Sequence, residues 1–166
     1  MKRILASLLL AACSLAACSA LSSDPAPFRQ PLKYFISEQM RARGLTVTLT
    51  DDDPLARPPT KYAAATKDLA YTIRHSGRYE ESPVTLVTWV YKTKKARDAA
   101  KEPFAEIPAD HKKHEVLSSK WEALDGGDLH IILFMESPNT SLGNQFELLM
   151  RAIRDGLPSV KAEEKK

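Results

Sequence analysis

The sequence predicts an α+β fold, with a single domain in which a mostly antiparallel sheet of about five strands carries about three packed helices. Three observations lead to this prediction. Five short segments have the apolar patterns of strands, and three longer segments have the period of a helix. A strong hairpin signal, Asp125-Gly126-Gly127-Asp128, directly joins two of the strand segments. The expected element order is α-β-β-β-α-β-β-α within residues 31–160, a length that suits one domain.

The first two helices are marked at their ends by proline, glycine and threonine. The first lies between Pro31, which suits an opening helical turn, and Gly44, which suits the position just after a helix. The second is expected at 93–104, with the threonine at its start as N-cap. Because proline cannot donate the helical hydrogen bond, we expect this helix to end near Pro103 or Pro108.

The third helix has the clearest amphipathic pattern of the three. We expect Gly156 and Pro158 to end it. Its apolar face consists of Leu142, Phe146, Leu149, Ile153 and Leu157.

Two strands are stronger predictions than the rest. Segment 84–91 is rich in β-branched and aromatic residues, and segment 129–136 is almost continuously apolar. The other strands are expected at 45–50, 68–75 and 116–124, with turns at Ser76-Gly77 and 80–83, while 57–66 fits either a loop or a short helix.

Alternation of side chains gives these two strands an aliphatic face and an aromatic face. The aliphatic face, the expected seat of the helices, consists of Val84, Leu86, Thr88, Val90, Leu129, Ile131, Leu133 and Met135. The aromatic face consists of Thr85, Val87, Trp89, Tyr91, His130, Ile132, Phe134 and Glu136. Either segment 51–66 or the first helix covers the aromatic face as a second small core, or this face binds a partner or lipid. The binding interpretation names Trp89, Tyr91, His130 and Phe134, and it requires partial exposure of an aromatic ring among them.

The first eighteen residues carry a targeting signal. Lys2 and Arg3 precede an apolar run that ends in Leu15-Ala16-Ala17-Cys18. The run is too short and wrongly flanked for a transmembrane helix, and it has the layout of a secretory signal peptide. Its ending resembles the lipobox of bacterial lipoproteins. This resemblance implies removal of a signal peptide at 1–17, a diacylglyceryl group on Cys18, and an acylated new N-terminus, with palmitate as an expected chain.

Two other processing sites remain open. Leu10-Ala11-Ala12-Cys13 is a second box with a shorter apolar stretch before it, and ordinary cleavage after Ala20 would secrete the protein. Ser19 follows the preferred cysteine, and in the enteric-type sorting rule that the resemblance implies, this favours the periplasmic side of the outer membrane. We interpret 18–30 as the lipidated cysteine with a flexible tether, and 161–166 as a charged, disordered tail.

Composition narrows the classes of function. Both cysteines lie within the first eighteen residues, so a chain lipidated at Cys18 has no disulfide and no free thiol for catalysis or metal binding. Loss of Lys2 and Arg3 lowers the 24 basic residues to 22 against 21 acidic ones, and the formal net charge falls from +3 to +1. This balance gives no argument for nucleic-acid binding or for a polybasic contact with the membrane, and we expect no cofactor.

One segment, Asp110-His111-Lys112-Lys113-His114-Glu115, concentrates potential metal ligands. Its two imidazoles are three residues apart, but the lysines between them oppose a cation, so we interpret the segment as a solvated loop. Asp51-Asp52-Asp53 lacks the alternation of a calcium loop and is interpreted as a polar turn. The cationic group that opens the second helix is interpreted as a solvated face, or as a contact for an acidic group such as lipopolysaccharide phosphate. It consists of Lys92, Lys94, Lys95 and Arg97.

The sequence therefore favours a non-enzymatic outer-membrane lipoprotein, held in the bilayer by acylated Cys18, that binds another protein or lipid of the cell envelope. Two alternatives stay open. One is an immunity or inhibitor lipoprotein that neutralises a toxin. The other is a small envelope hydrolase, metal-dependent or not, that uses His111, His114 or His130.

Overall fold

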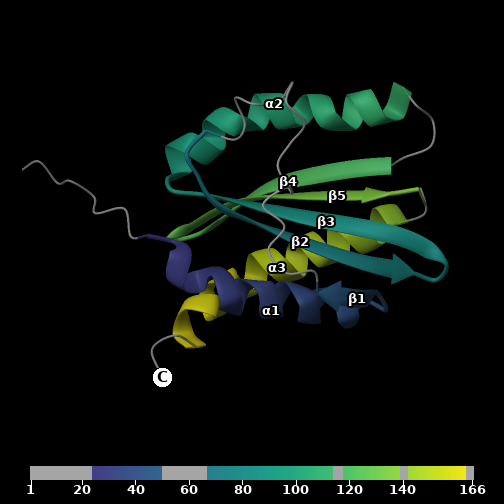
Figure 1. Cartoon of the computed structure of the whole chain (residues 1–166), viewed down its shortest axis with the longest axis horizontal. Helices are drawn as coiled ribbons and strands as arrows, with labels where there is room; N and C mark the ends of the chain where they lie inside the picture. The colour runs from purple at the N-terminus through teal and green to yellow at the C-terminus, as the bar shows by residue number, and fades with distance from the viewer. Residues whose placement is uncertain (1–23, 50–66, 114–117, 139–141, 164–166) are drawn as a thin grey trace, which may run out of the picture.

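The computed structural model describes residues 24–49, 67–113, 118–138 and 142–163. A five-stranded antiparallel sheet lies between one helix on one face and two helices on the other (Figure 1). The strand order is β1-β2-β3-β5-β4, so β1 and β4 form the two edges. The elements are η1 (Ala26–Phe28), α1 (Arg29–Arg41), β1 (Thr46–Leu49), β2 (Leu69–Tyr79), β3 (Ser82–Tyr91), α2 (Lys94–Lys113), β4 (Ser118–Gly126), β5 (Leu129–Ser137) and α3 (Gly143–Glu163). The predicted α+β class and element order are confirmed.

The aliphatic face of β3 and β5 is the main core, as predicted. It packs against α1 and α3, whose apolar faces interlock where Phe35 meets Gly156. A Cβ atom at Gly156 would come within 2.6 Å of Cε2 of the Phe35 ring, so the glycine permits close approach of the two helices. The completely buried members of this core include Leu32, Ile36, Met40, Leu86, Val90, Ile131, Leu133, Leu149, Ile153 and Leu157.

The third helix does not end at Gly156-Leu157-Pro158, because α3 continues to Glu163. Leu157 and Val160 remain buried in the main core on either side of Pro158. The Ser159 hydroxyl donates a hydrogen bond to the Gly156 carbonyl at 2.6 Å. Packing of the apolar residues on both sides therefore carries the helix through a proline that would end an isolated one.

The second helix is also longer than predicted and passes both prolines to end at Lys113. The Thr93 hydroxyl caps it, accepting the backbone N–H of Ala96 at 3.1 Å. Ala100 and Phe104 are buried on either side of Pro103, and the Phe104 ring lies 4.5 Å from that of Trp89, centroid to centroid. This packing holds α2 on the sheet beyond the first proline.

Two turns differ from the prediction or refine it. Ser76-Gly77 was expected as a turn but lies inside β2, where it pairs with β1. A Cβ at Gly77 would be 2.7 Å from the Thr46 carbonyl oxygen, so glycine permits the close approach of β1. The β2–β3 hairpin turns at Glu80-Glu81, within the predicted turn at 80–83, and Glu80 has a φ of 53°. Gly44 has a φ of 78° just after α1, as expected for a residue that ends a helix.

The folded part begins earlier than the predicted boundary at 31. Pro25 is buried, Phe28 packs against the main core, and α1 starts at Arg29. The predicted tether therefore overlaps with η1 and the first turn of α1, and the predicted tail overlaps with the end of α3. The signal peptide, Cys13, Cys18, the Asp51-Asp52-Asp53 segment and His114 lie outside the described residues.

Candidate functional site

The aromatic face is buried, so it lacks the partly exposed ring that its binding interpretation requires. Trp89 is 3 % exposed, Tyr91 0 % and Phe134 5 %, because α2 packs over them. The described cover comes from α2 and not from the first helix, since Ala100 and Phe104 complete the cluster, and segment 51–66 lies outside the described residues. Burial also raises the pKa of the Tyr91 hydroxyl well above its ordinary value. These rings form a second small core.

His130, the remaining member of the predicted surface, lies at the edge of this second core beside Asp125. The two residues face each other across the β4–β5 hairpin, with His130 Nδ1 3.2 Å from Asp125 Oδ1. The two atoms are close, but their geometry is not that of a hydrogen bond. Asp125 also lies 3.5 Å from the Lys94 ammonium. No group of three or more His, Cys, Asp or Glu side chains that could hold a metal ion occurs among the described residues.

Arg97 was predicted in a solvated cationic face, but its side chain is only 4 % exposed. Its guanidinium donates to the Leu124 carbonyl of β4 and, from Nε, to Asp98 Oδ1 at 3.0 Å. Arg97 therefore fixes the start of α2 to the edge strand β4. Lys92, Lys94 and Lys95 are exposed, as predicted.

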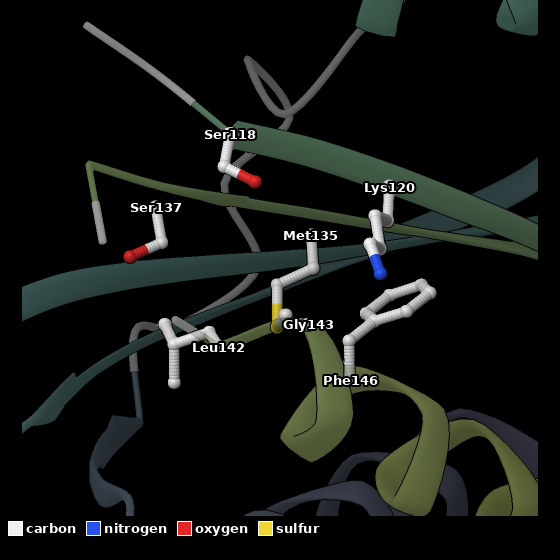
Figure 2. A pocket seen from close by; sticks show the side chains of 7 residues that line it. All are labelled: Ser118, Lys120, Met135, Ser137, Leu142, Gly143 and Phe146. Atoms are coloured by element: carbon white, nitrogen blue, oxygen red, sulfur yellow. The ribbon is translucent and has the colours of Figure 1, made fainter. Parts of the chain in front are cut away.

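A small hollow opens where β4 begins, β5 ends and α3 begins (Figure 2). The volume open to the centre of a water molecule is about 10 Å³, which is room for about one water. The Lys120 ammonium points toward it, and the buried Ser137 hydroxyl donates to the Pro83 carbonyl at 3.2 Å. The lining residues are Ser118, Lys120, Met135, Ser137, Leu142, Gly143 and Phe146.

At the mouth of the hollow, the Lys120 ammonium and the Ser118 hydroxyl are the donors for one small acidic group. The Ser137 hydroxyl already donates to the Pro83 carbonyl, and no carboxylate or imidazole is among the described lining. Lys120 has only a loose ion pair, 3.8 Å from the exposed Glu147 carboxylate. Sequence reasoning missed this hollow because its lining comes from three separated segments, none of which carries a motif.

The outer edge of β4 is the longest unpaired strand edge among the described residues. β4 has nine residues, whereas β1 at the other edge has four. Its hairpin loop is the two-residue turn Gly127-Asp128, with Gly127 at a φ of 76°. A glycine with positive φ at the first loop position indicates a type II′ turn, whose closing pair, Gly126 and Leu129, exchanges both backbone hydrogen bonds.

The alternation of an antiparallel ladder then fixes which backbone groups of β4 point outward. Leu124, Glu122 and Lys120 bond to β5, as Gly126 does. The residues between them direct their N–H and C=O groups away from the sheet, and these are Asp125, Ala123, Trp121 and Ser119. We call this row the β4 edge, and the hollow lies at its Ser118 end.

No family model, no curated protein and no solved structure matches the chain. Among the described helices, none combines the length and the apolar character needed to cross a bilayer. A proposal for the function of the domain therefore depends on the predicted lipobox and on the geometry of the β4 edge with its hollow.

Proposed function

We propose that this protein is a lipoprotein anchored in the outer membrane, facing the periplasm, whose domain binds an envelope protein as a non-enzymatic assembly module. The observation that carries the proposal is the ending Leu15-Ala16-Ala17-Cys18 behind Lys2 and Arg3. A triacylated cysteine gives a stable anchor, whereas one acyl chain binds only marginally. The β4 edge supports the binding role, because an extended segment of another protein can add to such an edge as a further strand.

In this mode an extended segment of the partner adds a strand beside β4. Backbone groups of Ser119, Trp121 and Ala123 pair with the segment, and each hydrogen bond contributes roughly 0.5–1.5 kcal/mol net. The side chains of Lys120 and Glu122 lie on the α3 side, where they contact Glu147 and Arg154. An acidic side chain of the partner at the Ser118 end would meet the Lys120 ammonium at the mouth of the hollow.

The binding role is tested by a matched pair of substitutions at one position. Ala123→Pro removes an outward N–H while leaving the β4–β5 ladder intact, and Ala123→Val adds similar volume but keeps the N–H. Both full-length proteins are expressed in a Gram-negative envelope, cross-linked and purified, and their thermal unfolding is compared. The proposal expects a partner captured with wild type and Ala123→Val and lost with Ala123→Pro at similar stability. Equal capture by both variants would refute use of the β4 edge.

The anchor has its own test. Mass spectrometry of the mature N-terminus should show an acylated Cys18, and Cys18→Ser should release the protein from the membrane fraction. An unmodified Cys18 contradicts the anchor. If the captured partner is an incoming toxin rather than a resident envelope protein, the immunity alternative replaces the assembly role on the same edge.

The hydrolase alternative is favoured by one observation, the approach of His130 to Asp125. A carboxylate beside an imidazole orients it in several hydrolases, although Lys94 shares the carboxylate here. His130→Gln should leave any measured hydrolysis unchanged under the binding proposal. Loss of a hydrolytic activity in that variant, with the fold retained, would favour the enzyme.

A further inference from the structure

The side chains along β4 match those of a second copy of the same strand. Lys120 and Glu122 lie on the α3 side, and Trp121 lies between them on the α2 side, against the second core. The side chain of Lys120 is 41 % exposed and that of Glu122 is 31 % exposed. Ser119, Trp121 and Ala123 are only partly buried. The helices therefore leave this strand accessible from its outer side.

Two copies of β4 can join only in registers that set outward backbone groups against outward backbone groups. An antiparallel register centred on Lys120 sets that ammonium against the same ammonium of the second copy. A register centred on Glu122 does the same for the carboxylate. Like charges directly opposite each other on neighbouring strands are destabilising, so the charges of β4 disfavour both registers.

A register centred on Trp121 has neither conflict. It sets Lys120 opposite Glu122 of the second copy, and symmetry gives this pair twice. These are the non-hydrogen-bonded positions of the ladder, where opposed side chains are closest. Trp121 then faces its own copy, and Ser119 faces Ala123 of the second copy. Opposite charges and paired aromatic rings both stabilise neighbouring strands, so this register is favoured on both faces.

The backbone of β4 suits the same register. Trp121 with its copy, and Ser119 with Ala123 on either side, are narrow pairs that each exchange two backbone hydrogen bonds. A register centred on Ala123 would keep backbone pairing but would set Glu122 against Leu124, which removes the charge pairs. The self-complementary register is therefore specific to this order of side chains.

The charged groups that face the paired segment from α3 agree with this register. Glu147 lies 3.8 Å from Lys120, and Arg154 contacts Glu122, each within one copy. In the paired form, the Lys120 of one copy joins the Glu122 of the other, so these four kinds of group alternate in sign across the junction. Pairing therefore adds attraction without breaking the internal contacts.

The symmetry of the pairing gives a closed dimer. A two-fold axis perpendicular to the sheet passes through the Trp121 pair, and the two sheets become one, with β1 at both outer edges. Because each copy uses the same edge, the interface is complete after two chains. The axis also keeps α1 of both copies on one face of the joined sheet (Figure 1), as two proposed anchors in one bilayer require.

We propose that the β4 edge pairs with β4 of a second copy in the register centred on Trp121, and that this dimer closes the edge until an extended segment of the envelope partner displaces it. The displacement depends on the proposed binding role, whereas the self-pairing does not. A long open strand edge invites unwanted pairing, and a closed dimer removes it.

Two charge reversals break the pairing separately and restore it together. Lys120→Glu sets a glutamate against Glu122 at both pairs, and Glu122→Lys sets a lysine against Lys120 at both pairs. When the two variants are mixed, every reversed residue again faces the opposite charge. Such a heterodimer requires that both variants fold, so its formation also excludes misfolding as the cause of the separate losses.

The assay measures association between two copies of the full-length chain that carry different C-terminal affinity tags. Both are expressed in one Gram-negative envelope, solubilised in detergent and captured through one tag, and the other tag is quantified. We expect wild type to capture wild type, and each reversal to capture itself about tenfold less or weaker still, because two attractive pairs become repulsive. The two reversals should capture each other near the wild-type level.

Matched controls reverse exposed charges away from the β4 edge. Lys95→Glu and Glu81→Lys change the net charge by the same amounts and should each retain self-capture. Equal self-capture by wild type, Lys120→Glu and Glu122→Lys overturns the dimer. Loss in both reversals with no recovery in their mixture overturns the register centred on Trp121.

The failure of the dimer can be told from the failure of the binding role. Glu122→Lys retains Lys120 and the outward backbone groups, so it should still capture the envelope partner, and in greater amount than wild type. A partner captured by wild type that shows no self-capture overturns the dimer alone. Self-capture that follows the charge pattern, with no partner captured by any variant, supports the dimer and contradicts the assembly role.

Discussion

Acidification should destabilise the domain through His75, which is completely buried between β2 and α1. His75 Nε2 lies 3.0 Å from the Lys33 carbonyl oxygen. A carbonyl only accepts, so Nε2 carries the hydrogen and Nδ1 is the bare nitrogen, for which no described residue provides a partner. Burial lowers the pKa of His75, and the nearby charges of Lys33 and Arg41 lower it further, against the opposing effect of the Lys33 carbonyl.

The size and sign of the effect follow from linkage. In the unfolded chain a histidine titrates near pH 6.5, whereas the folded His75 resists protonation to lower pH. Between these two pKa values the unfolded chain binds more protons, so the free energy of unfolding rises with pH. The stabilisation is complete above about pH 6.5 and is lost below it, with a limiting slope of about 1.4 kcal/mol per pH unit.

The assay is urea unfolding between pH 7.5 and pH 5, above the range in which ordinary carboxylates titrate. Wild type should lose stability toward pH 5 at a slope that approaches the limiting value. His75→Gln, which keeps a donor for the Lys33 carbonyl, should flatten the slope. His130→Gln serves as the control and should retain it. A His75→Gln slope equal to that of wild type would refute the role of this histidine.

Three substitutions test other features of the fold by thermal or urea unfolding. Glu80→Gly should raise the melting temperature, because glycine relieves about 1 kcal/mol of strain at a φ of 53°; a lower value contradicts this. Gly156→Ala should cost about 1–3 kcal/mol through its clash with Phe35, and Phe35→Leu in the same chain should recover part of the loss. Trp89→Ala should cost about 3–5 kcal/mol as a core residue, whereas an unchanged stability would mean that the ring is not buried.

The two faces of β3 and β5 were predictable because side-chain alternation depends only on local geometry. Val84 and Leu86 fall on one face and Val87 and Trp89 on the other, whatever covers them. The cover itself was not predictable. Pro103 argued for a short second helix, and only the tertiary contact of Phe104 with Trp89 explains why α2 continues over the aromatic face.

The candidate site was less accessible to sequence reasoning than the fold. The sequence predicted the hairpin at Gly126-Gly127. It did not predict that β4 is an edge strand of the sheet, which leaves one row of its backbone groups unpaired among the described residues. Arg97 stands among exposed lysines at the start of α2, but it is buried and its guanidinium donates hydrogen bonds to the Leu124 carbonyl and to Asp98. The hollow depends on Ser118, Ser137 and Gly143 meeting in space.

The packing of Leu157 against Gly126 has a practical consequence for tagging. A Cβ at Gly126 would lie 3.0 Å from that of Leu157, so the last turns of α3 lie beside the β4–β5 hairpin. The C-terminal part of α3 thus leaves the domain on the same side as the N-terminal segment (Figure 1). A reporter or affinity handle appended after α3 will therefore lie at the pole where the chain enters the domain. An insertion at Glu80-Glu81 would place a handle at the other pole, clear of both chain ends.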